Sequence, residues 1–251
     1  MLLTVDIGNT NITLGVYDNA NLLEVLRLPS DKSLEQAEYE ALLRKMFKGY
    51  EISECVIGSV VDELSLLIKA ACDEVFNIDT FLYNNSCSSG LKIKLQNPSE
   101  VGADRIANAL AAKTKYSLPA IVVDIGTATT FDIVSGDGDF LGGVIMPGVN
   151  LQLKSLCRNT SKLPSINAAF SEKAIGDCTE KALLSGVVRG SACAIEGLIT
   201  QCELELGVKA TIIATGGHSK LISEYMSKSF DYVDSTLTLD GLRLLYKLNA
   251  R

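Results

Sequence analysis

The hydrophobic and polar positions at the start of the chain follow a pattern that is typical of short strands. Apolar runs cover residues 2–6, 12–17 and 22–28, and turn-forming residues separate the second run from the third. Runs of this length, bounded by Asp and Asn, predict a meander of three adjacent strands. A further apolar run at residues 55–60 predicts a fourth strand, and a short one is expected at 80–83.

Apolar residues at helical spacing lie between and after these strands. Ser33 and Gln36 match the ends of a capping box, which predicts that a helix begins there. Asp62 is expected to cap the next helix, with Leu66 on its apolar side. The same spacing predicts later helices over residues 102–116, 179–206, 219–228 and 239–248.

The second half of the chain repeats the strand pattern of the first half. Apolar runs predict strands over residues 120–124, 129–135, 140–145 and 211–215. The sequence Gly-Asp-Gly-Asp at 136–139 separates the second run from the third and predicts a hairpin.

An internal similarity links the two halves. Residues 4–13 read TVDIGNTNIT and residues 122–131 read VVDIGTATTF, so that Asp6 and Asp124 stand 118 positions apart. In both, an apolar strand ends in Asp-Ile-Gly and is followed by a Thr-rich turn and a second strand. The duplication predicts an α/β protein of two similar domains, 1–117 and 118–251, that face each other across a cleft.

Composition and charge restrict the class of protein. Of 251 residues, 47% are hydrophobic and 21% are charged, which is typical of a globular chain and excludes a disordered one. A net charge of −7 argues against nonspecific binding of nucleic acid, which requires a positive surface. Asp6 interrupts the first apolar run, and no run approaches the roughly 18 residues of a membrane helix. We therefore expect a cytoplasmic protein without a membrane or nucleic-acid partner.

The cysteine and histidine content excludes two further kinds of site. The chain has seven Cys without a C-x-x-C pair, and His218 is the single His. A disulfide framework and the common zinc motifs are therefore not expected, and buried thiols in a reducing cytosol account for the cysteines.

The duplicated turns carry residue types that can bind phosphate. Gly8 allows the backbone to approach a ligand closely, and the side chains of 9–11 can donate hydrogen bonds to phosphate oxygens. Asp6 would bind Mg²⁺ through water, because this ion keeps part of its hydration shell. Asp124 and Thr127 hold the corresponding places in the second copy. A single Asp-x-Gly string followed by a nearby Thr is common at ordinary turns, but two copies at equivalent places in the two halves favour a nucleotide site.

A third turn follows the strand predicted at 211–215. Gly216 and Gly217 precede a helix, and bare backbone at such a place can receive the flat face of a nucleoside. A tight turn capped by Ser219 explains the same residues equally well. His218 is expected to be a structural or rim residue, since no nearby residue identifies a catalytic partner for it.

The string Asn-Pro-Ser-Glu-Val-Gly-Ala-Asp-Arg at 97–105 suggests a base. Asn97 and Pro98 match a helix start, but Gly102 weakens a helix by about 1 kcal/mol relative to Ala. In the alternative interpretation, Arg105 binds an anion and Asp104 accepts a hydroxyl proton. A carboxylate is a credible base for attack of a hydroxyl group on phosphorus.

Taken together, these motifs resemble a known family. Asp-Ile-Gly-Asn-Thr-Asn at 6–11, Gly-Ala-Asp-Arg at 102–105, Val-Asp-Ile-Gly-Thr-Ala at 123–128, Gly-Gly-Val-Ile-Met-Pro-Gly at 142–148 and Thr-Gly-Gly at 215–217 occur in the order seen in type III pantothenate kinases. The resemblance spans residues 1 to about 245. It implies two ribonuclease H-like domains of the actin/Hsp70/sugar-kinase superfamily, each a mixed sheet flanked by helices. It also implies ATP-dependent phosphorylation of pantothenate to 4′-phosphopantothenate, the first step of coenzyme A synthesis.

The resemblance also implies roles for individual residues. Asp104 would be the proton acceptor, Asp124 would help to bind K⁺ or NH₄⁺, and Leu95 stands where many family members carry Tyr. The substrate-binding residues would be Gly102, Ala103, Asp104, Arg105 and Thr179. With the third turn included, the ATP-binding residues would be Asp6, Ile7, Gly8, Asn9, Thr10, Asn11, Ile12, Thr13, Thr127, Gly216 and Gly217. Family members are homodimers whose pantothenate pocket lies at the subunit interface.

Two other functions fit the same fold. One is a kinase for another small hydroxylated acid, and the other is an accessory or regulatory protein without turnover. The presence of Asp6, Asp104 and Asp124 weighs against the second, because a pure binding module requires none of the three carboxylates.

Overall fold

A computed structural model describes residues 1–250 of the chain and divides them into two compact units. The first unit consists of Met1–Lys92, Gln96–Ala111 and the chain from Thr236 onward. The second unit consists of Ile93–Leu95 and Ala112–Ser235.

The first unit is built on a mixed sheet of five strands. The strands are β1 (Leu2–Ile7), β2 (Asn11–Asp18), β3 (Asn21–Pro29), β4 (Glu54–Ser59) and β5 (Phe81–Leu82), in the order β3-β2-β1-β4-β5. The first three strands pair antiparallel, which confirms the predicted meander, while β4 runs parallel to β1. β1 is buried at most positions because it lies in the centre of this sheet.

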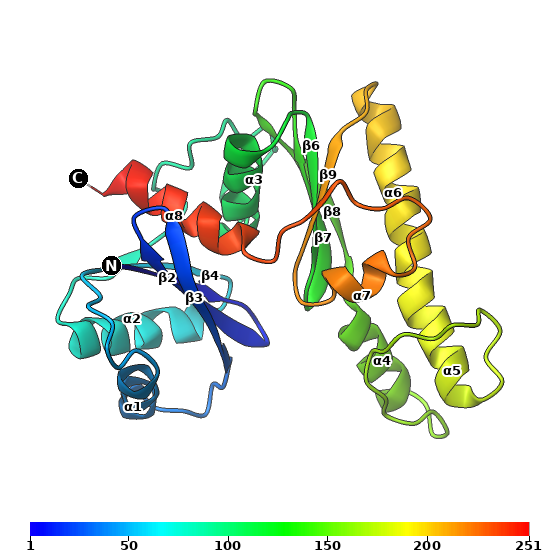
Figure 1. Cartoon of the computed structure of the whole chain (residues 1–251), viewed down its shortest axis with the longest axis horizontal. Helices are drawn as coiled ribbons and strands as arrows, with labels where there is room; N and C mark the ends of the chain where they lie inside the picture. The colour runs from blue at the N-terminus through cyan, green and yellow to red at the C-terminus, as the bar shows by residue number, and fades with distance from the viewer. Residues whose placement is uncertain (251) are drawn as a thin grey trace. The chain divides into compact units, whose positions relative to one another are not determined.

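Helices cover both faces of this sheet. α1 (Gln36–Met46) and α2 (Asp62–Phe76) lie side by side along one face (Figure 1) and form a hydrophobic core with β1 and β2. α8 (Leu237–Asn249) lies against β1 and β4 on the other face, where Leu242 contacts Gly58. α3 (Ala103–Lys115) begins beside the same glycine.

Two details of the predicted helix starts are wrong. α1 begins at Gln36 with a capping box between Glu35 and Glu38, because Ser33 instead donates two hydrogen bonds to Asp31 in the preceding turn. α2 has Val61 at its cap position, and Asp62 is its first residue. Leu66 is 69% exposed rather than buried, because Leu64 and Ile68 occupy the core-facing positions on either side of it.

The second unit repeats the sheet of the first. Its strands are β6 (Ala120–Ile125), β7 (Ala128–Val134), β8 (Phe140–Pro147), β9 (Thr211–Thr215) and β10 (Tyr232–Val233), in the order β10-β9-β6-β7-β8. Read from β8, this order and the strand directions match those of the first sheet. The duplicated α/β architecture that the internal similarity predicts is therefore confirmed.

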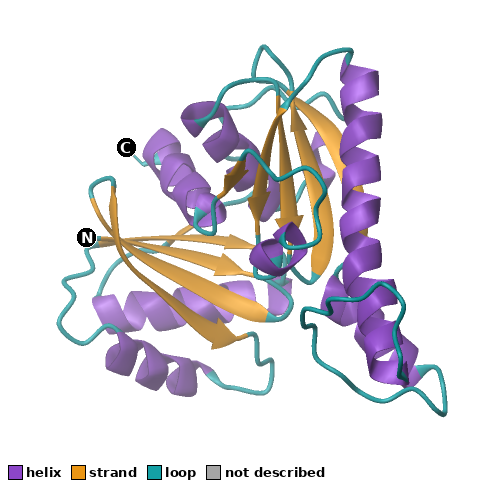
Figure 2. Ribbon diagram, turned by 45° about the vertical axis from the view of Figure 1, so that its right-hand side comes forward, coloured by secondary structure: helices purple, strands orange, loops and turns teal. Residues whose placement is uncertain are grey.

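A long helical stretch lies along the second sheet (Figure 2). α5 (Thr179–Leu184), a π-helical turn (Ser185–Arg189) and α6 (Gly190–Leu206) follow one another without a break. This stretch is long and apolar enough to cross a membrane by length and composition alone, and it is the one such stretch within residues 1–250. Val188, Ala192 and Ile195 of this stretch are buried in the core of the second unit. A buried core helix can have the same length and apolar composition as a membrane helix.

The remaining helices of the second unit differ from the sequence predictions. α4 (Val149–Arg158) was not predicted. α7 (Ser219–Ser223) is shorter than the predicted helix over 219–228. The backbone N–H groups of Ser227 and Lys228 donate to the carboxylate of Glu196 on α6. These two N–H groups therefore bond to a side chain and do not make the backbone hydrogen bonds of a helix.

The compact units are not contiguous in sequence, unlike the predicted ranges 1–117 and 118–251. The division falls between Ala111 and Ala112, and α8 belongs to the first unit. α8 packs on the first sheet through its apolar face, on which Leu239 and Leu242 are buried.

Candidate functional site

The two duplicated turns have similar but unequal geometry. In the first turn, the N–H of Gly8 donates to the carbonyl oxygen of Asn11 at 3.0 Å. In the second, the N–H of Gly126 donates to that of Ala128, also at 3.0 Å. The first turn is thus one residue longer, and the sheet pairing shows the same: Ile7 pairs with Ile12, whereas Ile125 pairs with Thr129.

The polar residues of both turns face solvent. Asn9, Thr10 and Asn11 in the first turn and Thr127 in the second are exposed. Hydroxyl and amide groups in such turns can donate to phosphate oxygens. The exposed side chains are those that the sequence assigns to phosphate binding.

Other residues of the first predicted loop have different surroundings. Ile7 and Ile12 are almost fully buried and belong to the core of the first unit. A nucleotide could contact these two residues through their backbone only. Asp6 and Thr13 form a cross-strand pair beside the turn and are partly buried.

The second unit brings Asp124 and Gly216 together. β6 and β9 are parallel neighbours, and Asp124 pairs with Thr215, so that Gly216 follows beside the carboxylate. Gly216 has a φ of +86°, and a Cβ atom there would overlap Oδ1 of Asp124 and the backbone of Ile125. Glycine is required for both reasons. Gly217 is exposed and has open space around its Cα.

His218 fixes the end of the same connection. Its backbone N–H donates to the carbonyl oxygen of Ile125 at 3.1 Å, which ties the chain after β9 to the end of β6. Burial lowers the pKa of the His218 imidazole, so the neutral ring is favoured. These observations support the structural role predicted for His218.

The predicted base lies at the start of α3. The motif 97–105 does not form one helix: Pro98–Glu100 is a single 3-10 turn, and Val101 is extended before α3 begins at Ala103. Gly102 lies in this break. A Cβ atom on Gly102 would lie 2.5 Å from Oδ1 of Asp104, so glycine allows the carboxylate to fold back over the backbone.

The surroundings of Asp104 favour its protonated form more than water does. Burial raises the pKa of the carboxyl group, and the backbone N–H of Arg105, which donates to Oδ1 at 2.8 Å, offsets part of that effect. A carboxylate with a raised pKa is a stronger proton acceptor than an ordinary Asp.

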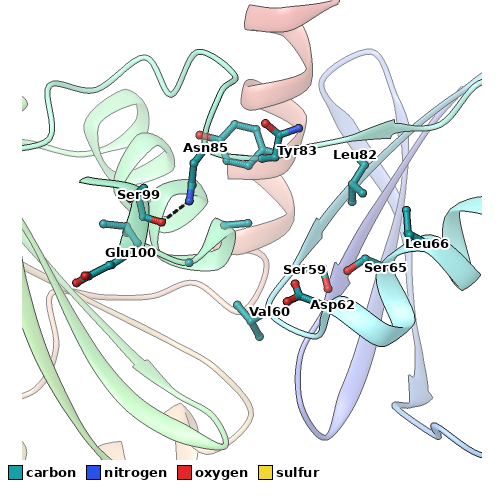
Figure 3. A pocket seen from close by; sticks show the side chains of 14 residues that line it. Ser59, Val60, Asp62, Ser65, Leu66, Leu82, Tyr83, Asn85, Ser99 and Glu100 are labelled. Atoms are coloured by element: carbon teal, nitrogen blue, oxygen red, sulfur yellow. Dashed lines mark hydrogen bonds between the residues drawn. The ribbon is translucent and has the colours of Figure 1, made fainter. Parts of the chain in front are cut away.

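A cavity of about 600 Å³ lies beside this turn in the first unit. Figure 3 shows Ser59, Asp62 and Ser65 on one side of it and Asn85, Ser99 and Glu100 on the other. Val60, Leu66, Leu82, Tyr83, Asn84, Val101, Gly102 and Ala103 complete the lining. The Asn85 side-chain amide donates to the carbonyl oxygen of Ser99 and holds that side of the cavity in place.

Gly102 and Ala103 in this lining are predicted from the sequence, whereas Tyr83 is not. Burial raises the pKa of the Tyr83 hydroxyl to about 12. Its sequence signal is weak, because Tyr83 follows a two-residue strand and looks like an ordinary apolar position.

Thr179 and Leu95 belong to the second unit. Thr179 is exposed at the first position of α5 and borders a groove of about 480 Å³ with Leu156, Leu163 and Leu183. Leu95 packs against Gly142, which has a φ of +126° that residues with a Cβ atom rarely adopt. The predicted substrate residues are thus divided, with 102–105 in the first unit and Thr179 in the second.

The donor set suits a weakly ligated magnesium ion. Within residues 1–250, no group of three or more His, Cys, Asp or Glu side chains could hold a metal ion. Mg²⁺ in phosphotransferases is commonly bound by one or two carboxylates, waters and substrate phosphates. A single carboxylate at the end of β1, such as Asp6, fits this requirement.

Solved structures of known proteins share this architecture. The chain is similar to a Baf family protein from Campylobacter jejuni (TM-score 0.61, 23% identity, 98% of this chain and 97% of that chain covered). It is also similar to the activator of 2-hydroxyisocaproyl-CoA dehydratase from Clostridium difficile with bound ADPNP (TM-score 0.54, 12% identity, 98% and 95% covered). The two sheets with their Asp-containing turns define the class of actin-like ATPase and sugar-kinase folds.

The sequence comparisons identify the family within this class. The model of the type III pantothenate kinase family matches residues 2–201. Type III pantothenate kinases from Exiguobacterium sibiricum (41% identity, 99% of this chain and 100% of that protein) and Roseiflexus castenholzii (40%, all of both chains) are similar over their full length. The chain belongs to the type III pantothenate kinase family.

Proposed function

We propose which residues perform the reaction of this family, the ATP-dependent phosphorylation of pantothenate to 4′-phosphopantothenate in coenzyme A biosynthesis. The enzyme is a phosphotransferase that uses ATP and a divalent metal ion. The observation that carries the proposal is Asp104: its carboxyl group has a raised pKa and lies at the first turn of α3, where Gly102 and Ala103 border a cavity. Asp104 accepts the proton of the attacking primary hydroxyl, and Arg105 binds the pantothenate carboxylate.

ATP and its ions are assigned to the duplicated turns. The exposed polar groups of residues 6–13, together with Thr127, bind the phosphates, and Gly216 and Gly217 receive the nucleoside. Asp6 holds Mg²⁺ through water. Asp124 contributes to a K⁺ or NH₄⁺ site, where a cation would offset negative charge that develops near the transferred phosphoryl group.

The quaternary structure and the location complete the proposal. Thr179 contacts pantothenate, and the enzyme acts as a cytoplasmic homodimer with the pantothenate pocket near the subunit interface. The exposed position of Thr179 beside an apolar groove supports this arrangement. The family membership does not favour an accessory protein or a kinase for another acid.

The test is transfer of labelled phosphate from ATP to pantothenate with Mg²⁺, in K⁺ buffer and in Na⁺ buffer. We expect phosphopantothenate in K⁺ buffer, a much slower rate in Na⁺ buffer, and a loss of the difference in Asp124→Asn. Equal rates in both buffers would remove the monovalent cation from the proposal without affecting the kinase activity. Sedimentation of the same preparation tests the homodimer.

A further inference from the structure

Each phosphate turn is held by the residue that follows the third strand of its unit. In the first unit, the backbone N–H of Ser30 donates to the carbonyl oxygen of Thr10 at 3.0 Å. In the second unit, the N–H of Gly148 donates to the carbonyl oxygen of Thr127 at 3.1 Å.

The two contacts are part of the internal duplication. Ser30 follows Pro29 at the end of β3, and Gly148 follows Pro147 at the end of β8. Ser30 and Gly148 stand 118 positions apart, the same offset that separates Asp6 from Asp124. The connection after the third strand therefore bonds to its turn in both halves, although the turns differ in length.

The side chain of Ser30 strengthens the first contact. Its Oγ donates to the carbonyl oxygen of Gly8 at 2.6 Å, so that Ser30 bonds to two carbonyl groups of one short turn. In a planar trans peptide, the C=O and the following N–H point in opposite directions. Because the Gly8 carbonyl points toward Ser30, the N–H of Asn9 points away from it. Backbone N–H groups fixed in this way favour an anion such as phosphate.

Gly148 has no hydroxyl group like that of Ser30, but its backbone lies very close to the second turn. A Cβ atom on Gly148 would overlap the carbonyl oxygens of Gly126 and Thr127. Its φ of −70° is accessible to any residue, so the closeness of the turn is the reason for glycine at this position.

We propose that Ser30 and Gly148 are positioning residues for ATP, each of which orients the backbone of one phosphate turn. The proposal rests on the assignment of these turns to ATP under Proposed function. It concerns the binding of nucleotide, and neither residue is required to touch the substrate.

The direct test compares Ser30→Ala, Ser30→Thr and the control Ser33→Ala. Ser33 lies in the same connection, and its Oγ donates to the carboxylate of Asp31 at 2.6 Å on an exposed surface. We expect Ser30→Ala to weaken binding of a nonhydrolysable ATP analogue with Mg²⁺ about five-fold, in keeping with one lost hydrogen bond. The KM for pantothenate should change by less than about two-fold, since the residues assigned to pantothenate, 102–105 and Thr179, are not part of this turn. Ser30→Thr should restore binding, because it retains the hydroxyl group.

Unchanged nucleotide affinity in Ser30→Ala, or an equal loss in Ser33→Ala, would overturn the proposal. Failure of Ser30→Thr to restore affinity would also overturn it. Gly148→Ala, compared with Gly136→Ala, which has open space around it, should weaken the same binding. The Ser30 series decides the proposal if Gly148→Ala does not fold.

Asp6→Asn separates this inference from the assignment on which it rests. If Asp6→Asn weakens binding of the Mg²⁺ nucleotide and Ser30→Ala does not, the phosphate turn stands and the role of Ser30 is wrong. If neither variant changes binding, the assignment of the first turn to ATP fails and the role of Ser30 fails with it.

Discussion

Gly216 lies so close to Asp124 that no side chain fits between them. A Cβ atom on Gly216 would overlap Oδ1 of Asp124, and its φ of +86° is itself unfavourable for other residues. The carboxylate proposed to bind a monovalent cation is thus confined by the bare backbone that is proposed to receive the nucleoside.

Gly216→Ala is therefore expected to impair both stability and nucleotide use. The left-handed conformation alone costs about 1–2 kcal/mol for a residue with a Cβ atom. Displacement of Asp124 adds to this cost and should raise the KM for ATP. Thermal unfolding and steady-state kinetics measure the two effects.

Gly207→Ala is the matched control for this variant. Gly207 also has a left-handed backbone, with a φ of +70°, but nothing lies within 4 Å of a Cβ atom there. It should lose stability without a change in the KM for ATP. If both variants gave the same kinetics, the contact between Gly216 and Asp124 would have no functional role.

Asp104→Asn should abolish phosphate transfer without weakening the fold. An amide cannot accept the hydroxyl proton, but its oxygen can still accept the hydrogen bond from the N–H of Arg105. Burial raises the pKa of Asp104 in the folded state. At pH values between the unfolded and the folded pKa, the unfolded chain therefore binds fewer protons than the folded chain, and the free energy of unfolding falls as pH rises. The ionised carboxylate therefore costs stability at pH 7, and Asp104→Asn should be as stable as the wild type or more stable.

The pH dependence of the wild type provides a second test of Asp104. A base must be deprotonated, so kcat/KM should fall on the acid side through a pKa above the ordinary value of Asp, which is about 3.9. An acid limb at or below that ordinary value, or full activity in Asp104→Asn, would show that another group accepts the proton.

Gly241→Ala should destabilise the first unit. Gly241 on α8 touches the backbone of α3, and a Cβ atom there would overlap the main chain of Ala107. Nearby, the hydroxyl of Thr238 donates to the side chain of Asn108 at 2.8 Å, so the two helices are tightly joined. Overpacking of this kind costs about 1–3 kcal/mol, which denaturant unfolding can measure.

Gly197→Ala should have the opposite effect on stability. Gly197 lies within α6, is exposed, and has nothing within 4 Å of a Cβ atom. Ala is favoured over Gly at such a helical position by about 1 kcal/mol. Equal destabilisation by both variants would contradict the contact between α8 and α3 as the cause.

Arg189→Lys should loosen the segment over residues 159–178 that precedes Thr179. The Arg189 guanidinium donates to the carbonyl oxygens of Ser171 and Glu172 at 3.0 and 2.9 Å and lies 4.7 Å from the centre of the Tyr225 ring. Lys cannot reproduce this planar arrangement. Limited proteolysis should cleave the segment faster in this variant, and the KM for pantothenate should rise because Thr179 follows it.

Lys181→Gln is the control for Arg189→Lys. It removes an ion pair with Asp177 in the same region, and solvent screens this pair because both side chains are exposed. The cleavage rate of the segment should stay near that of the wild type. Equal cleavage of all three proteins would show that Arg189 does not hold the segment.

The sequence by itself determined the repeated architecture. Apolar runs ending in Asp-Ile-Gly at Asp6 and Asp124 predicted the two meanders, and the sheets have the matching strand order. Such patterns are local, because a buried central strand requires a continuous apolar run whatever packs on it. The same local reasoning identified the turns and the motif at Asp104, and the resemblance of these motifs to type III pantothenate kinases indicated the family.

Only the tertiary structure decided which distant residues meet. The apolar face of α8 packs on the first sheet, and after α7 has ended Glu196 accepts the backbone N–H groups of Ser227 and Lys228. The contacts of Ser30 with Gly8 and of Gly216 with Asp124 likewise join residues far apart in sequence. Periodicity records which face of an element is apolar, but the partner on that face depends on the packing of the whole unit.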